Sequence, residues 1–197
     1  MTNILEVKNL TMHYETLDGD VDAVKNISFN VKAGESFGIV GESGCGKTSV
    51  AMSLLQLQAE NGKISNGSIL FDGIELVGMS ENDLRKVRWD GISIVFQGAM
   101  NAWNPVVKIG EQIREAMREH SPESTKSQNT LKIKELFSMV GLDASVADRF
   151  PHELSGGMKQ RAIIALALSC DPKLVIADEP TTAPVSYTHL TLPTIRS

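Results

Sequence analysis

The sequence of 197 residues has little cysteine, few aromatic residues and no long apolar run. Its two cysteines, Cys45 and Cys170, lie far apart, which favours free thiols in a reducing compartment. No window reaches the roughly 18–20 apolar residues of a membrane span, and residues 1–10 lack the pattern of a signal peptide. Basic residues number 19 against 24 acidic ones and form no stripe, so nucleic acid is not expected as a partner. We expect a cytoplasmic protein, unless a partner holds it at a membrane.

The most informative stretch is SFGIVGESGCGKTS, residues 36–49. Its apolar start, residues 36–40, predicts a buried strand, and SVAMSLLQLQ at 49–58 predicts a helix behind the loop. Between them stands the complete G-x-x-x-x-G-K-[ST] spacing of a phosphate-binding loop, in which backbone N–H groups surround the phosphates. The lysine supplies positive charge to the β- and γ-phosphates, and the threonine hydroxyl is a ligand for Mg²⁺. The predicted binding residues are Gly41, Glu42, Ser43, Gly44, Cys45, Gly46, Lys47, Thr48 and Ser49.

Two strands are predicted before this loop, at residues 4–14 and 21–35, with turn chemistry at Asp18-Gly19. They suggest an antiparallel sheet beside a parallel nucleotide-binding core. Tyr14 ends the first of these strands, where an aromatic ring can stack on an adenine face. Taken alone, an ordinary tyrosine at a strand end is an equal alternative.

The pattern after the loop continues with strands and one short helix. GSILFDG at 67–73 follows the break at Asn66-Gly67 and predicts a strand, and Ser80 is a predicted N-cap for a helix over 81–87. ISIVFQ at 92–97 predicts a second buried strand. Its last residue, Gln97, would stand at the carboxyl edge, where it could reach a ligand or its metal. For Gln97 alone, a solvated strand end is the favoured alternative.

The residue pattern over 98–150 predicts a helical insert between core strands. Helical spacing is found at 108–120 and 128–142, separated by a polar loop, and Gly141 is a predicted helix stop. The predicted buried faces are Ile109, Ile113, Ala116 and Met117 on the first helix and Ile133, Leu136, Phe137 and Val140 on the second.

The last informative stretch is ELSGGMKQR followed by LVIADE. Residues 154–158 would open an apolar helix that runs to about Ser169, and the glycines would leave N–H groups open as a second anion site. The apolar run from residue 174 predicts a buried strand that delivers the Asp178 carboxylate to Mg²⁺ or its water shell. Glu179 follows, where it could polarise a water for attack on the γ-phosphate.

In this order, the phosphate-binding loop, Gln97, the LSGGM element and the acidic pair resemble the nucleotide-binding subunits of ATP-binding cassette (ABC) transporters. The likeness covers residues 4–183. FQGAMNAWNPVVKIGEQI and VKNLTMHYETLDGDVDAVKNISF resemble the dipeptide and oligopeptide importers, and nickel importers are similar there. The resemblance implies an α/β P-loop NTPase core with an antiparallel β subdomain and an inserted α-helical subdomain.

The resemblance also implies a mechanism in which two such domains face each other head to tail and share each ATP. Tyr14 would stack on adenine and Glu179 would be the catalytic base. The residues that would serve the partner's ATP are Leu154, Ser155, Gly156, Gly157 and Gln160. The implied ligands of Mg²⁺ are Thr48, Gln97 and Asp178.

The partners that the resemblance implies are a second ATPase subunit, identical or paralogous, two membrane permease subunits and an extracytoplasmic solute-binding protein. The protein would then work at the cytoplasmic face of the cell membrane. The alternatives are a soluble ABC ATPase without a transport role, or an inactive fragment.

The end of the chain departs from the family. After Ala183 the family continues with Leu-Asp, a helix, a strand and a switch histidine, whereas residues 184–197 are PVSYTHLTLPTIRS. From Val185 this tail resembles an in-frame translation of a sequencing-library adapter, with a genuine divergent tail as the alternative. We therefore expect a domain over 1–183 that is incomplete at its C-terminus and a non-native tail. Without the next strand, the 197-residue chain is expected to be insoluble or molten and without ATPase activity.

Overall fold

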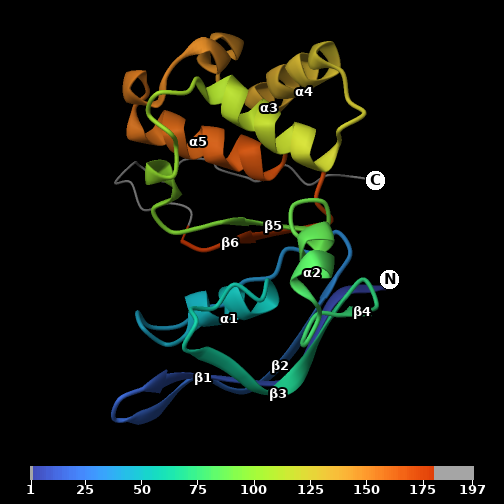
Figure 1. The fold of residues 1–197 in the computed structure, drawn as a ribbon, viewed down its shortest axis with the longest axis vertical. Helices are drawn as coiled ribbons and strands as arrows, with labels where there is room; N and C mark the ends of the chain where they lie inside the picture. Colours follow the sequence, from blue (N-terminus) through green and yellow to red (C-terminus); the bar gives the residue numbers. More distant parts are fainter. Residues whose placement is uncertain (1, 180–197) are drawn as a thin grey trace. The chain divides into compact units, whose positions relative to one another are not determined.

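The computed structural model describes residues 2–179 of the chain (Figure 1). The predicted tail over 184–197 lies outside these residues. The described residues divide into two compact units, one ending at Arg88 and the other beginning at Trp89.

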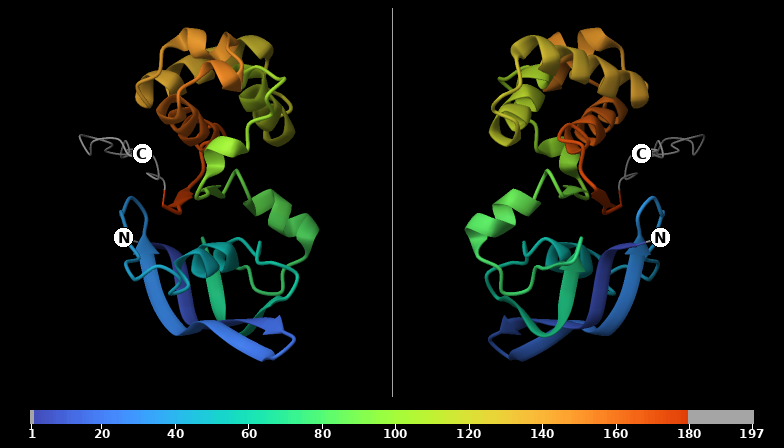
Figure 2. Two further views of the ribbon diagram at one scale, coloured as in Figure 1. Left: turned by 90° about the vertical axis from the view of Figure 1, so that its left-hand side faces the viewer. Right: turned by 90° about the vertical axis from the view of Figure 1, so that its right-hand side faces the viewer.

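The first unit is built on an antiparallel sheet, as the sequence predicts, and the structure gives its strand order as β2-β1-β3-β4. Its strands are β1 (Asn3–Thr16), β2 (Gly19–Lys32), β3 (Gly62–Phe71) and β4 (Ile74–Glu75). The hairpin of β1 and β2 is a long twisted ribbon (Figure 2). Leu5 and Val7 of β1 are buried at alternating positions, and after a register shift Leu10 and Met12 resume the alternation, so that one face of the sheet carries the core.

Strand β3 is longer than predicted, because Asn66-Gly67 does not break it. The pairing of β1 with β3 shifts register between Lys8 and Thr11, opposite these residues. Gly67 has a φ of +108°, and a Cβ there would lie 2.6 Å from the Cα of Leu10. A bulge at a glycine therefore lets the strand continue where the sequence predicts a stop.

The prediction of a buried strand at residues 36–40 is wrong for this structure. These residues are not in a strand, and Phe37, Ile39 and Val40 are 47%, 45% and 96% exposed. Within residues 2–179, no strand pairs with them, and an isolated extended segment leaves its backbone N–H and C=O groups to solvent. Phe37 instead stacks on Phe29 of β2, with ring centroids 5.1 Å apart.

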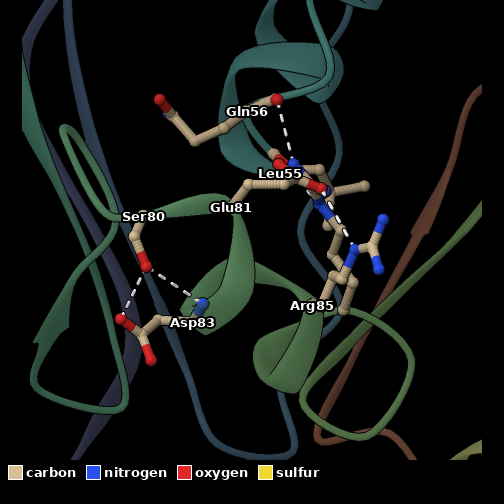
Figure 3. A network of polar contacts seen from close by, with 7 residues as sticks. Leu55, Gln56, Ser80, Glu81, Asp83 and Arg85 are labelled. Atoms are coloured by element: carbon tan, nitrogen blue, oxygen red, sulfur yellow. Dashed lines mark hydrogen bonds and ion pairs between the residues drawn. The ribbon is translucent and has the colours of Figure 1, made fainter.

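Two short helices complete the first unit. Helix α1 (Lys47–Leu54) follows the glycine-rich loop and is shorter than predicted, because Gln56 adopts a φ of +52° that a helix does not permit. Helix α2 (Glu81–Val87) begins as predicted at Ser80, whose hydroxyl accepts the N–H of Asp83 (Figure 3). Arg88 donates to the carbonyl oxygens of Leu55 and Gln56 at the end of α1. This guanidinium therefore satisfies carbonyls that the short helix leaves open.

The second unit combines a parallel pair of strands with helices (Figure 1). The strands are β5 (Ile92–Val95), which ends two residues before the predicted Gln97, and β6 (Leu174–Ala177). The helices are α3 (Ile109–His120), α4 (Lys126–Met139) and α5 (Gly156–Ala167), with 3-10 turns η1 (Ala99–Asn101), η2 (Ala144–Asp148) and η3 (Pro151–Glu153). The predicted helices over 108–120 and 128–142 are therefore present, and α5 ends two residues before the predicted Ser169.

Local capping sets the ends of α4. Thr125 and Gln128 form a reciprocal capping box, so α4 begins two residues before the predicted start. At the other end Gly141 has a φ of +69°, and the N–H of Leu142 bonds the carbonyl of Phe137 over 2.7 Å. This is the pattern of a Schellman stop, and it confirms Gly141 as the helix terminator.

Phe137 lies at the centre of the second unit's core. Its side chain is fully buried among residues of α3, α5 and the 3-10 turns. Truncation to alanine leaves a cavity that rigid helices fill only in part.

In the full-length protein, we expect Phe137→Ala to lower the free energy of unfolding by about 3–5 kcal/mol, measured as the urea midpoint and slope. Leu131→Ala is the matched control, because Leu131 lies on the same helix and is 59% exposed. Its effect should stay within about 0.5 kcal/mol. Equal losses for the two variants would show that the packing of α4 is not as described.

Candidate functional site

Glycines shape the predicted phosphate-binding loop in the first unit. Gly46 caps α1 with a φ of +92°, and a Cβ there would lie 2.1 Å from the carbonyl oxygen of Ala23 on β2. Gly44 also has a positive φ, +80°. At Gly41 a Cβ would lie 2.5 Å from the Sγ of Cys45. The loop therefore requires glycine at Gly44 and Gly46, for backbone conformation at both and for close approach to β2 at Gly46.

Lys47 lies across this loop. Its ammonium donates to the carbonyl oxygens of Gly41 and Glu42 over 2.9 and 2.8 Å. The charge is thus held beside the loop and the N-terminus of α1, whose open N–H groups also favour an anion. The positive end of the helix and the ammonium act on the same place, as phosphate binding requires.

Tyr14 reaches α1 from the sheet. It lies near the end of β1, opposite Val21 of β2 and Gly62 of β3. Its hydroxyl is 3.3 Å from the Oγ of Ser49, in the first turn of α1. The structure thus brings Tyr14, predicted from the sequence, to the helix that follows the phosphate-binding loop. Stacking of its ring on adenine stays a prediction.

The second unit gathers polar residues at the carboxyl ends of its two parallel strands. The N–H of Asp178 donates to the carbonyl of Val95 over 2.9 Å, which extends the pairing by one residue. Asp178 is buried, whereas Glu179 is exposed and has a φ of +45°. The amide of Gln97 donates to Glu179 over 2.8 Å, although these residues are 82 positions apart. The three predicted residues therefore meet at one edge.

The LSGGM element lies at the start of α5. Ser155 is the N-cap, and its hydroxyl accepts the N–H of Met158 over 3.4 Å. A Cβ at Gly157 would meet nothing within 4 Å, so the backbone is open to a ligand there. Leu154, in contrast, is buried in the core of its own unit. Gln160 lines a small pocket together with Met100 and Glu179.

The residues predicted to bind Mg²⁺ offer suitable donors. A hydroxyl, a carboxamide oxygen and a carboxylate are oxygen ligands of the kind that Mg²⁺ prefers. Thr48 belongs to the first unit, and Gln97 and Asp178 belong to the second, so their joint use stays a prediction. Within residues 2–179, no group of three or more histidine, cysteine or acidic residues could hold a metal ion.

One contact was missed by sequence reasoning. The motifs indicate Gln97 and Glu179 separately, and the hydrogen bond between them was not predicted. The available signal was that the strands at 92–97 and 174–178 both end in a polar residue, since carboxyl ends of paired parallel strands lie at one edge.

Comparison with known proteins identifies the family of this chain. The family model described as "ABC transporter" matches residues 24–182. The dipeptide transport ATP-binding protein DppD of Lactococcus lactis is 43% identical over 182 residues, covering 91% of this chain and 52% of the relative. The oligopeptide transport ATP-binding protein OppD of Haemophilus influenzae is 44% identical over 191 residues, covering 93% and 57%. The chain therefore spans about half the length of the curated relatives it matches.

Solved structures of ABC transporter cassettes have the same fold as this chain. A dimeric structure of the ABC transporter cassette MJ0796 matches with a TM-score of 0.81 at 30% identity, covering 92% of this chain and 76% of that one. A post-hydrolysis dimer of MJ0796 bound to ADP and Pi matches with a TM-score of 0.80 at 30% identity, covering 91% and 75%. The predicted P-loop ABC ATPase fold, with its antiparallel sheet and its helices, is confirmed.

No helix within the described residues is both long and apolar enough to cross a bilayer.

The phosphate-binding loop, the LSGGM helix and the acidic strand end follow one another in this order along the chain. The family model covers most of the sequence, and curated relatives match over nine-tenths of it. The chain belongs to the ABC transporter family.

Proposed function

We propose that this chain is the ATP-binding and ATP-hydrolysing part of a subunit that powers import of dipeptides or oligopeptides. The observation that carries the proposal is the contact of Gln97 with Glu179 beside buried Asp178, in a chain that also has a complete phosphate-binding loop. The solute class is supported by the printed names of the relatives, which are dipeptide and oligopeptide transport proteins. Those names favour peptides over nickel, and a transport role over that of a soluble ABC ATPase.

ATP binding would use the first unit. The backbone N–H groups of the loop and the N-terminus of α1 would surround the phosphates, and Lys47 would exchange its carbonyl partners for phosphate oxygens. Tyr14 would pack against adenine from the end of β1. Mg²⁺, when bound, neutralises charge on the β- and γ-phosphate oxygens. Thr48, Gln97 and Asp178 would provide its protein ligands.

Hydrolysis would use Glu179 as general base. Its carboxylate is exposed and accepts a hydrogen bond from Gln97 on one oxygen. This bond fixes the orientation of the carboxylate, while its other oxygen can take a proton from an attacking water. Asp178 is buried beside it and suits a metal-binding role, since its carboxylate is already shielded from solvent.

Two such chains would share each ATP. Ser155 and the open backbone of Gly157 lie at the N-terminus of α5, where they would bind the γ-phosphate of nucleotide held by a partner. The dimeric state of the solved cassettes supports this arrangement. The partner would be an identical or paralogous ATPase subunit. Two permease subunits and an extracytoplasmic solute-binding protein would complete a transporter at the cytoplasmic face of the membrane.

Removal of the Lys47 ammonium tests the nucleotide site. In the full-length protein we expect Lys47→Ala to weaken Mg-ATP binding by about 100-fold or more, since each charge-assisted bond contributes about 1.5–3 kcal/mol. Titration calorimetry would measure this. Lys25→Ala is the control, because Lys25 lies on β2 of the same unit with an exposed side chain. Normal ATP binding by Lys47→Ala would make the loop assignment wrong.

Substitution of Ser155 tests the proposed function itself. In vesicles that contain the full-length subunit, its permeases and its binding protein, we expect Ser155→Arg to leave ATP affinity of the isolated subunit nearly unchanged. ATP hydrolysis and peptide uptake should both be blocked, because the bulky side chain keeps the two subunits apart.

The control for this experiment is Thr125→Arg, which removes the N-cap of α4 and should cost similar stability, about 0.5–2 kcal/mol. It should keep both hydrolysis and uptake. Loss of ATP affinity in isolated Ser155→Arg would mean that the LSGGM element serves its own nucleotide. Hydrolysis without ATP-dependent peptide uptake by the wild-type complex would exclude the importer role.

A further inference from the structure

The segment after Gln97 lies on the helix that carries the LSGGM element. Turn η1 packs against α5, and a Cβ at Gly156 would lie 3.7 Å from the Sδ of Met100. The pocket beside Glu179 is lined by Phe96 and Met100 from this segment and by Gln160 from α5. Residues 96–100 and the first turns of α5 are therefore in direct contact, inside the second unit.

Trp103 fixes this contact with a directed bond. Its indole is 6% exposed, and its Nε1–H donates to the carbonyl oxygen of Lys159 over 3.3 Å. Lys159 lies in the first turn of α5, where its own N–H bonds the carbonyl of Ser155 over 2.9 Å. A buried indole N–H needs an acceptor, and the second lone pair of a helical carbonyl supplies it here. Trp103 is thus two hydrogen bonds away from Ser155.

The same segment is also held from α3. The side chain of Gln112 accepts the N–H of Asn104 over 2.9 Å and donates to the carbonyls of Asn104 and Val107 over 3.0 and 2.8 Å. The carboxamide of Gln112 therefore makes three hydrogen bonds to the backbone immediately after Trp103. Between Gln97, which bonds Glu179, and this clamp, Trp103 makes the side-chain bond to α5.

We propose that Trp103 is a positioning residue that holds the segment of residues 97–103 in a fixed position against the LSGGM helix, α5. A displacement of Gln97 at one nucleotide would then move the start of α5, which serves the other nucleotide. Trp103 would act through Gln97 and Ser155, without touching ATP. This inference rests on the proposed ATPase function, and it goes beyond that function by assigning a role to Trp103, which is not among the residues proposed to bind or hydrolyse ATP.

The test compares two replacements of Trp103 in the full-length protein assembled with its transporter. Trp103→Phe keeps a large apolar ring and removes the N–H donor, whereas Trp103→His keeps an N–H donor on a smaller, more polar ring. We expect Trp103→Phe to lower kcat for ATP about 3–10-fold, the effect of losing a single hydrogen bond, with KM within about twofold. Trp103→His should restore kcat to within about twofold of wild type.

A role in packing alone predicts the opposite order, because phenylalanine fills the buried site better than histidine. Unfolding midpoints measured on all variants separate an effect on kcat from a loss of stability. Trp89→Phe is the matched control: it also removes an indole, one whose ring contacts His120, and should leave kcat unchanged.

Three outcomes overturn the inference. Wild-type kcat in Trp103→Phe does so, and so does a kcat for Trp103→His below that of Trp103→Phe. Both leave the proposed function intact. Absence of ATP hydrolysis by the wild-type protein overturns the proposed function, and this inference with it.

Discussion

The parallel pairing of β5 with β6 is the constraint on which the chemistry of the second unit depends. It places Val95 opposite Ala177 and continues through the bond from Asp178 to Val95. Only because the strands run parallel do both carboxyl ends lie at one edge, where Gln97 meets Glu179. The segment after Gln97 then packs against α5 through η1 and Trp103. The acidic strand end and the LSGGM helix are thereby connected through one continuous segment.

The first unit holds the charged Lys47 side chain beside a strongly curved loop backbone. Gly46 brings the loop so close to β2 that no side chain fits, and the positive φ of Gly44 and Gly46 turns the chain into α1. Tyr14 reaches the same helix from β1. Loop, lysine and tyrosine therefore depend on the long hairpin of β1 and β2 as a rigid support.

The local sequence was enough to predict the structure where interactions within a few residues determine it. The amphipathic faces of α3 and α4, the N-cap of α2 and the stop at Gly141 were all predicted, because side-chain periodicity and backbone conformation act within a few residues. It was not enough for residues 36–40, whose strand formation depends on a partner strand, nor for the bulge at Gly67, which depends on β1. The contacts of Gln97 with Glu179 and of Trp103 with Lys159 join distant positions, and both depend on how elements far apart in the chain pack together.

Glu179, which accepts a hydrogen bond from Gln97, is the proposed general base, and replacement by glutamine tests that role most directly. Glutamine keeps the size of the side chain and still accepts a hydrogen bond, but it cannot take a proton from water. In the full-length protein, Glu179→Gln should bind Mg-ATP with unchanged affinity and turn it over about 10²–10⁴-fold more slowly. Sedimentation should then show dimers closed around ATP. Turnover equal to that of the wild-type protein would contradict the assignment of Glu179 as the base.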